Sequence, residues 1–154
     1  MVSPILLVCG GFLLAVLWMD LMFDVQVLGQ GQQRQELPEA VLDSIAAYYK
    51  RVTTLARPMG HAVGAMMLIG MLTLLLQTVR AKERRWIAVV SLFLFGVPVA
   101  LALFHVYPNA VRLGSRADST LEQSRLARAI HRGHLLCLGS MLSFVVLQLF
   151  AALP

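Results

Sequence analysis

Four long apolar runs, separated by short polar stretches, constrain the fold of this 154-residue chain more than any other feature. A helix needs about 20 apolar residues to cross the hydrocarbon core of a bilayer. The runs at about residues 4–28, 59–79, 86–106 and 133–153 each meet that requirement. Only 14% of the residues are charged, against about 25% in an average soluble domain. We therefore predict one integral membrane domain, all-α, built as an antiparallel four-helix bundle.

A further helix is predicted between the first two spans, at about residues 38–56. The Gly/Gln-rich segment 29–37 has no apolar period, which is typical of a turn region. Pro38 is tolerated at the first position of a helix and Pro58 ends it. Apolar residues then recur at steps of three and four, which predicts an amphipathic helix on the membrane surface: Val41, Ile45, Tyr48, Val52 and Leu55.

The last helix is predicted to be much longer than the bilayer is thick. Ser119 and Glu122 form a capping-box pattern, so the helix should start near Ser119 and run to about Ala152. At 1.5 Å per residue this is about 50 Å, so its first turns should stand above the membrane and carry arginines. In the third span, Pro98 should kink or loosen the helix.

The charges and cysteines point to a membrane rather than to nucleic acid or a disulfide framework. The net charge is +5, with the basic residues in the polar gaps between apolar runs, where lipid headgroups explain them. We expect no nucleic-acid partner. Cys9 and Cys137 should lie near opposite membrane faces, too far apart for a disulfide.

The basic residues of the connections predict the orientation. The short turn at residues 80–85 holds four Lys or Arg, whose charges have no other evident use. The two long connections hold nine Lys or Arg, and a simple count would place those connections in the cytoplasm. Several of these arginines can serve the polar cluster, so we favour a cytoplasmic turn and two cytoplasmic termini. The predicted location is the bacterial inner (plasma) membrane.

Antiparallel spans should gather most of the polar side chains at one membrane face. The ends of the first and third spans and the starts of the second and fourth meet there. Ionisable groups at membrane depth usually have partners or a function. The predicted site at this face consists of Asp20, Asp24, His61, His105, Arg128, His131 and His134.

Three interpretations of these residues remain open. Imidazoles from neighbouring helices can bind a haem iron or a transition metal, here through His61, His105 and His131. An acid/base site for a lipophilic substrate would use His131, His134, Asp20, Asp24 and Arg128 as catalytic residues. In the third interpretation the aspartates pair with Arg57, Arg128 or Arg132 in an interhelical network that needs no ligand.

The chain resembles the anthrone-oxygenase-like family of small four-helix membrane proteins. The resemblance rests on four spans, a surface helix after the first, a basic middle turn and the run around Arg128 and His131. In that family a histidine is followed three residues later by an arginine. Here His134 stands at that place, with Arg132 nearby. The resemblance implies cofactor-independent oxidation of a phenolic polycycle.

Two classes of function follow from the sequence. The first is a small-molecule site with an oxidoreductase-like or carrier-like role. The alternative is a non-catalytic accessory or assembly subunit of a larger membrane complex. The expected partners are the lipid bilayer and other membrane subunits or further copies of the chain.

Overall fold

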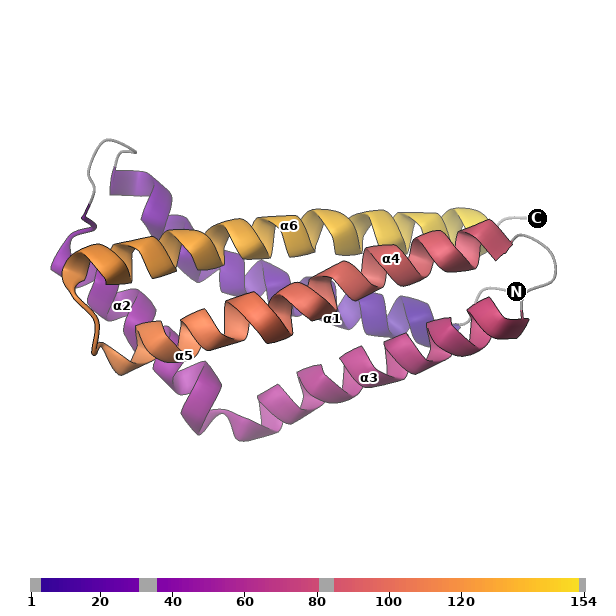
Figure 1. Cartoon of the computed structure of the whole chain (residues 1–154), viewed down its shortest axis with the longest axis horizontal. Coiled ribbons are helices and arrows are strands. Elements are labelled where there is room, and N and C mark those ends of the chain that lie inside the picture. The colour runs from indigo at the N-terminus through magenta and orange to yellow at the C-terminus, as the bar shows by residue number, and fades with distance from the viewer. Residues whose placement is uncertain (1–3, 31–35, 81–84, 153–154) are drawn as a thin grey trace.

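The computed structural model describes residues 4–30, 36–80 and 85–152, and these ranges are almost entirely helical (Figure 1). No strand occurs within them. The elements in chain order are α1 (Pro4–Asp24), the 3-10 turn η1 (Val25–Gln30), α2 (Glu39–Lys50), the π-helical turn η2 (Arg51–Leu55), α3 (Arg57–Arg80), α4 (Arg85–Leu101), the π-helical turn η3 (Ala102–Val106), α5 (Tyr107–Ser115) and α6 (Thr120–Ala152).

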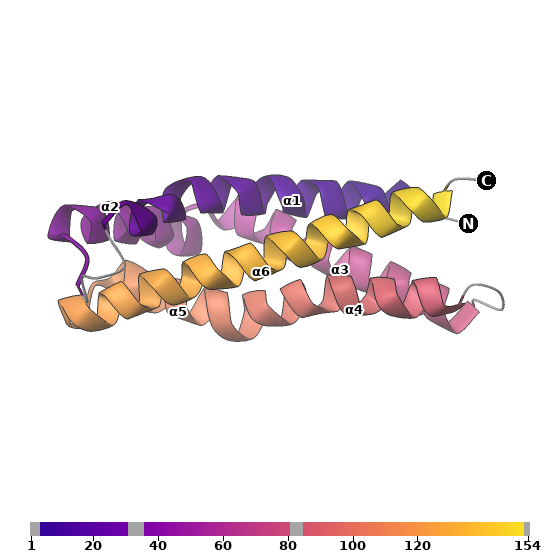
Figure 2. The same cartoon turned by 90° about the horizontal axis from the view of Figure 1, so that it is seen from above.

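Four helical stretches of the described chain are long and apolar enough to cross a membrane: Pro4–Leu28, Arg57–Arg80, Arg85–Ser115 and Thr120–Ala152. The long helix α6 packs along α1 and α4, and α3 packs on the same two helices. The start of α1 and the end of α6 lie at one end of the molecule, and α2 lies at the other (Figures 1 and 2). The predicted fold class, a four-helix membrane bundle with a surface helix, is confirmed.

Two separate clusters of buried side chains hold the bundle together. One lies among the spans and consists of Leu6, Cys9, Leu13, Leu74, Phe95, Met141 and Phe144. The other lies where α2 and α5 cover α6, and includes Leu42, Ile45, Tyr49, Leu113 and Ile130. Cys9 and Cys137 are both buried and free, in agreement with the prediction of no disulfide.

The third span does not stop near Val106, where the apolar run ends, but continues as one helical stretch to Ser115. Pro108 does not end it, because the proline lies in the first turn of α5 and the turn before it, Ala102–Val106, is widened to a π-helix. The other proline, Pro98, removes the donor that the Leu94 carbonyl would have within the helix. Ser140 of α6 replaces it, donating its hydroxyl to that carbonyl at 2.8 Å.

The buried face of α2 is rotated relative to the predicted stripe. The buried residues are Leu42, Ile45, Ala46 and Tyr49, whereas the predicted Leu55 is 73% exposed. The α-helix ends at Lys50 and the π-helical turn η2 follows, which changes the periodicity. The helix packs mainly on α5 rather than only on the membrane surface.

Arg116 joins three elements at the end of α5. Its backbone is left-handed, with φ 54°, which ends the helix. Its guanidinium donates to Glu39 and, at 2.8 Å, to Asp43, both on α2. It also donates to Gln123 on α6 at 3.3 Å. The predicted start of α6 is confirmed nearby, where the Ser119 hydroxyl accepts the Glu122 N–H at 3.4 Å.

Gly114 permits α5 to touch the backbone of α2, so Gly114→Ala should separate the two helices. A Cβ there would lie 2.8 Å from the Lys50 nitrogen and 3.1 Å from its Cα. Backbone atoms cannot rotate away, and overpacking of this kind costs about 1–3 kcal/mol. We expect a lower thermal unfolding midpoint in detergent. Gly139→Ala, which meets nothing within 4 Å, is the control, and an equal loss in both variants would contradict the contact.

Candidate functional site

The polar end of the bundle lies at one depth along three spans. Asp24 lies 20 residues beyond Pro4, His105 lies 20 residues beyond Arg85, and Arg132 lies 20 residues before Ala152. At 1.5 Å per residue each is about 30 Å from the far end of its helix. This is the thickness of the hydrocarbon core. These side chains therefore lie at the boundary between hydrocarbon and headgroups.

A buried histidine lies between two carboxylates at this boundary. The Nδ1 atom of His134 lies 2.6 Å from Oδ2 of Asp24, and its Nε2 atom lies 3.8 Å from Oδ2 of Asp20. Asp24 is 1% exposed and His134 is 5% exposed. A carboxylate can only accept, so Nδ1 donates its proton to Asp24. Asp20 and Asp24 are four residues apart and thus share one face of α1.

Two tyrosines of α2 complete the hydrogen bonding of the carboxylates. The Tyr48 hydroxyl donates to Oδ1 of Asp20 and the Tyr49 hydroxyl donates to Oδ1 of Asp24, each at 2.6 Å. Burial, together with the neighbouring aspartates, raises the pKa of both phenols. Both tyrosines therefore stay protonated and keep donating at any physiological pH.

We call Asp20, Asp24, Tyr48, Tyr49 and His134 the Asp–His–Tyr cluster. It joins α1, α2 and α6 through hydrogen bonds that run from side chain to side chain. Each carboxylate has a tyrosine on one oxygen and faces the imidazole with the other. This arrangement compensates the burial of the charges. Chemically, it can fix the surface helix onto the ends of two spans.

The other predicted site residues do not join the Asp–His–Tyr cluster. His61 on α3 and His105 in η3 are exposed, and neither makes a hydrogen bond to a described residue. His131 is buried at 6% exposure, and neither of its ring nitrogens has a hydrogen-bond partner among the described residues. Arg128 is half-buried. The predicted grouping of His61, His105 and His131 around one cofactor has no counterpart in these contacts.

A metal centre is not formed by the side chains that the structure describes. Within residues 4–30, 36–80 and 85–152, no group of three or more His, Cys, Asp or Glu is placed to hold a metal ion. In the Asp–His–Tyr cluster the Nδ1 atom of His134 is hydrogen-bonded to Asp24, and its Nε2 atom faces Asp20 at 3.8 Å. The aspartates also do not pair with Arg57 or Arg132, as the network interpretation assumed, but with His134 and the tyrosines.

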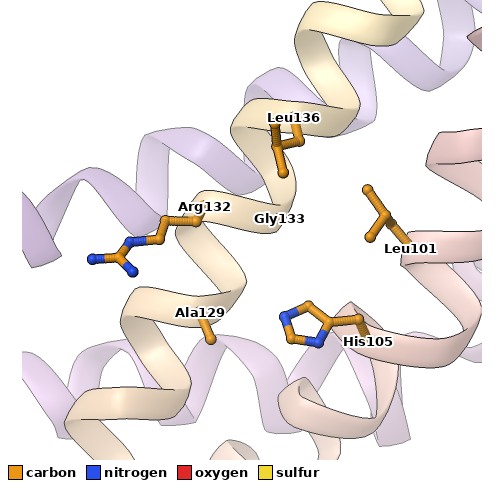
Figure 3. A pocket seen from close by; sticks show the side chains of 6 residues that line it. All are labelled: Leu101, His105, Ala129, Arg132, Gly133 and Leu136. Carbon is orange, nitrogen blue, oxygen red and sulfur yellow. The ribbon is translucent and has the colours of Figure 1, made fainter.

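A groove lies on another face of α6, between that helix and η3. Its volume is about 310 Å³, and it is lined by Leu101, His105, Ala129, Arg132, Gly133 and Leu136. Figure 3 shows the His105 ring reaching toward Ala129 and Gly133, while the Arg132 side chain extends outward from α6. None of the Asp–His–Tyr residues lines the groove. The cluster and the groove are therefore separate features at one membrane boundary.

Tyr48 and Tyr49 are the cluster residues that were not predicted from the sequence to belong to the site. The available signal was their position late in a helix whose apolar face must rest on the spans. An aromatic ring with a hydroxyl suits such a position, because buried tyrosine hydroxyls usually find a polar partner. The partner is the Asp20 and Asp24 pair, which sits at the same end of the bundle.

Comparison with known proteins identifies the family. A family model named SHR3 chaperone and described as "ER membrane protein SH3" matches residues 1–150. No curated protein and no solved structure matches the chain. The match overturns the resemblance to the anthrone-oxygenase-like family, which was wrong, and gives no support to a bacterial inner membrane. It covers nearly the whole chain, and the chain belongs to the SHR3 chaperone family of ER membrane proteins.

Proposed function

We propose that this protein is a non-catalytic accessory factor of the endoplasmic-reticulum membrane that assists the folding or packaging of other polytopic membrane proteins, transporters in particular. The observation that carries the proposal is the family match over residues 1–150. The accessory role was the alternative function that the sequence left open. We place both termini and the basic turn on the cytoplasmic side, on the strength of the turn's charges.

The geometry of the Asp–His–Tyr cluster supports a structural role at this site. A catalytic group must reach a substrate, yet Asp24 is 1% exposed and its two oxygens are occupied by Tyr49 and His134. The groove on α6 does not include these residues. We therefore assign the cluster the task of holding α2 against the spans.

The outer surface of α3 supports contact with other membrane segments. Of its 24 residues, only Gly70 and Leu74 are buried. A Cβ at Gly60 or Gly64 on this helix would meet nothing within 4 Å, and small residues permit close approach of helices in membranes. Beyond Gly64, toward the far end of α3, the large exposed side chains are apolar: Leu68, Ile69, Leu72, Leu75, Leu76 and Val79.

The proposal is tested in cells that lack the protein. A polytopic transporter is expressed there together with a soluble secretory protein as the control cargo. We expect the monodisperse fraction of the transporter in mild detergent to fall severalfold, and the transporter to stay in the endoplasmic reticulum, while the soluble cargo is unaffected. Equal export of the transporter with and without the protein would contradict the proposal.

One conservative variant separates the accessory role from catalysis. In Asp20→Asn the amide oxygen can still accept the Tyr48 hydroxyl, and Asp24 still pairs with His134. An accessory protein should keep transporter export close to the wild-type level. A reaction that depends on the Asp20 carboxylate would lose most of its activity. Loss of export by this variant, at unchanged thermal stability, would count against the structural assignment.

A further inference from the structure

The groove between η3 and α6 combines cationic and apolar lining at the membrane boundary. Arg132 lines the groove and carries a permanent positive charge at its rim, where the side chain extends outward from α6 (Figure 3). His105 supplies an imidazole, which has an N–H donor in either charge state. Leu101 and Leu136 supply apolar walls, and Leu136 is 64% exposed. Arg132 and His105 each lie about 30 Å from the far ends of their helices. The polar part of the groove is therefore at headgroup depth.

The two polar side chains of the groove are not used by the rest of the described bundle. Among the residues that the structure describes, Arg132 and His105 make no hydrogen bond and no ion pair. The neighbouring Arg125, by contrast, lies 3.7 Å from Glu122. Cationic side chains at this depth are usually paired or used. An anion from outside the chain would meet that need.

The backbone of the two elements shapes the groove. The segment Ala102–Val106 is π-helical, and such turns recur at functional sites. Gly133 faces it, and a Cβ at that position would lie 2.9 Å from Cγ2 of Val106 and 3.7 Å from Cδ2 of His105. The glycine lets α6 approach the π-helical turn closely. The His105 ring then points toward Ala129 and Gly133 of α6 (Figure 3).

We propose that this groove binds an anionic phospholipid, with its phosphate at Arg132 and His105 and an acyl chain along Leu101 and Leu136. Arginine and imidazole N–H groups are donors suited to a phosphate, and the leucines continue toward the hydrocarbon core. A phospholipid carries both parts in one molecule and reaches the groove from the bilayer. An acidic side chain of another membrane protein would pair with Arg132 but would not fill the apolar part of the groove. The proposal concerns lipid binding and stands whether or not the accessory function is correct.

The test uses the full chain, purified in mild detergent and reconstituted into phosphatidylcholine nanodiscs. A small share of phosphatidylinositol with a diazirine in its acyl chain is added, light is applied, and labelled peptides are identified by mass spectrometry. We expect label near Leu101 and Leu136, and severalfold less label from a diazirine phosphatidylcholine. Excess inorganic phosphate should not reduce the label. Displacement by phosphate would overturn the lipid assignment in favour of a free-anion site.

Matched variants decide whether the groove or the general surface charge is responsible for labelling by the anionic lipid. Arg132→Gln should lower labelling about fivefold, because one arginine near an anionic headgroup contributes about 1 kcal/mol. Arg125→Gln, two turns away on the same helix and outside the groove, should change it less than twofold. Both side chains are exposed, so both variants should fold. An equal fall in the two variants, or no fall in Arg132→Gln, would overturn the proposal.

Retained lipid labelling with loss of transporter binding in Arg132→Gln would show that Arg132 binds an acidic segment of another protein instead of a lipid.

Discussion

Asp24→Ala is expected to lower the free energy of unfolding by about 2–6 kcal/mol, because it leaves two buried donors without an acceptor and each costs about 1–3 kcal/mol. The substitution leaves the Nδ1 proton of His134 and the hydroxyl of Tyr49 without their acceptors, which lie at 2.6 Å in the wild type. Asp24, Tyr49 and His134 are all buried residues, with exposed fractions of 1%, 3% and 5%, so bulk water does not reach the donors that lose the carboxylate. The measurement is SDS-induced unfolding of the purified protein in detergent.

Asp43→Ala is the matched control for this prediction. It removes the same carboxylate from a side chain that is 64% exposed and bonds Arg116 at 2.8 Å. Exposed ion pairs contribute about 0–1 kcal/mol, so the loss should be several-fold smaller than in Asp24→Ala. Similar losses in the two variants would show that the Asp–His–Tyr cluster does not fix the position of α2. Release of α2 can be followed separately, by protease cleavage after Lys50.

The span count could be predicted from the sequence because a bilayer imposes a length on every apolar run. The ends of the spans were harder to predict. The third helix continues to Ser115 because the chain tolerates Pro108 in the first turn of α5. The predicted stripe on α2 holds at Ile45, and Val41 and Tyr48 pack partly buried beside it. It fails at Leu55, because a π-helical turn, which sequence periodicity does not reveal, follows the helix.

The depth of the candidate residues along the bundle could be predicted from the sequence, but the direction in which each side chain points could not. Counting residues from the ends of the spans places Asp20, Asp24, His105 and His134 at one boundary. The rotation of each helix about its own axis then decides which of them meet. That rotation depends on packing, for example of Phe95 against Phe144, and it turns His105 toward the groove and away from Asp24. Hydropathy alone carries no information on it.

The family was misidentified for a related reason. Four spans, a surface helix and a basic turn describe the topology of a small membrane bundle, and unrelated families can share a topology. The local run around Arg128 and His131 is short, and polar residues at the start of a membrane helix recur for general electrostatic reasons. The match over residues 1–150 depends on which residue stands at each position. The topology alone does not carry that information.

Gly70→Leu is expected to destabilise the bundle by about 3 kcal/mol, near the upper end of typical overpacking costs. Even a Cβ at Gly70 would lie 2.3 Å from Cζ of Phe95 and within 3.0 Å of both Cε atoms. The ring cannot move aside, because Phe95 is fully buried and packs edge-on against Phe144 with a centroid distance of 5.1 Å. The larger side chain must therefore push α3 away from α4. Thermal unfolding in detergent, followed by tryptophan fluorescence, measures the loss.

Gly64→Leu should have the opposite sign and so serves as the control. It lies on the same helix, but a Cβ there meets nothing within 4 Å, and leucine favours a helix over glycine by up to about 1 kcal/mol. The two variants thus share the change in helix propensity and differ only in the neighbour that they meet. A gain at Gly64 together with a loss at Gly70 would show that contact with Phe95 sets the spacing of α3 and α4. If both variants gained stability, α3 would not rest on that ring, and its place in the bundle would have to come from its contacts with α1.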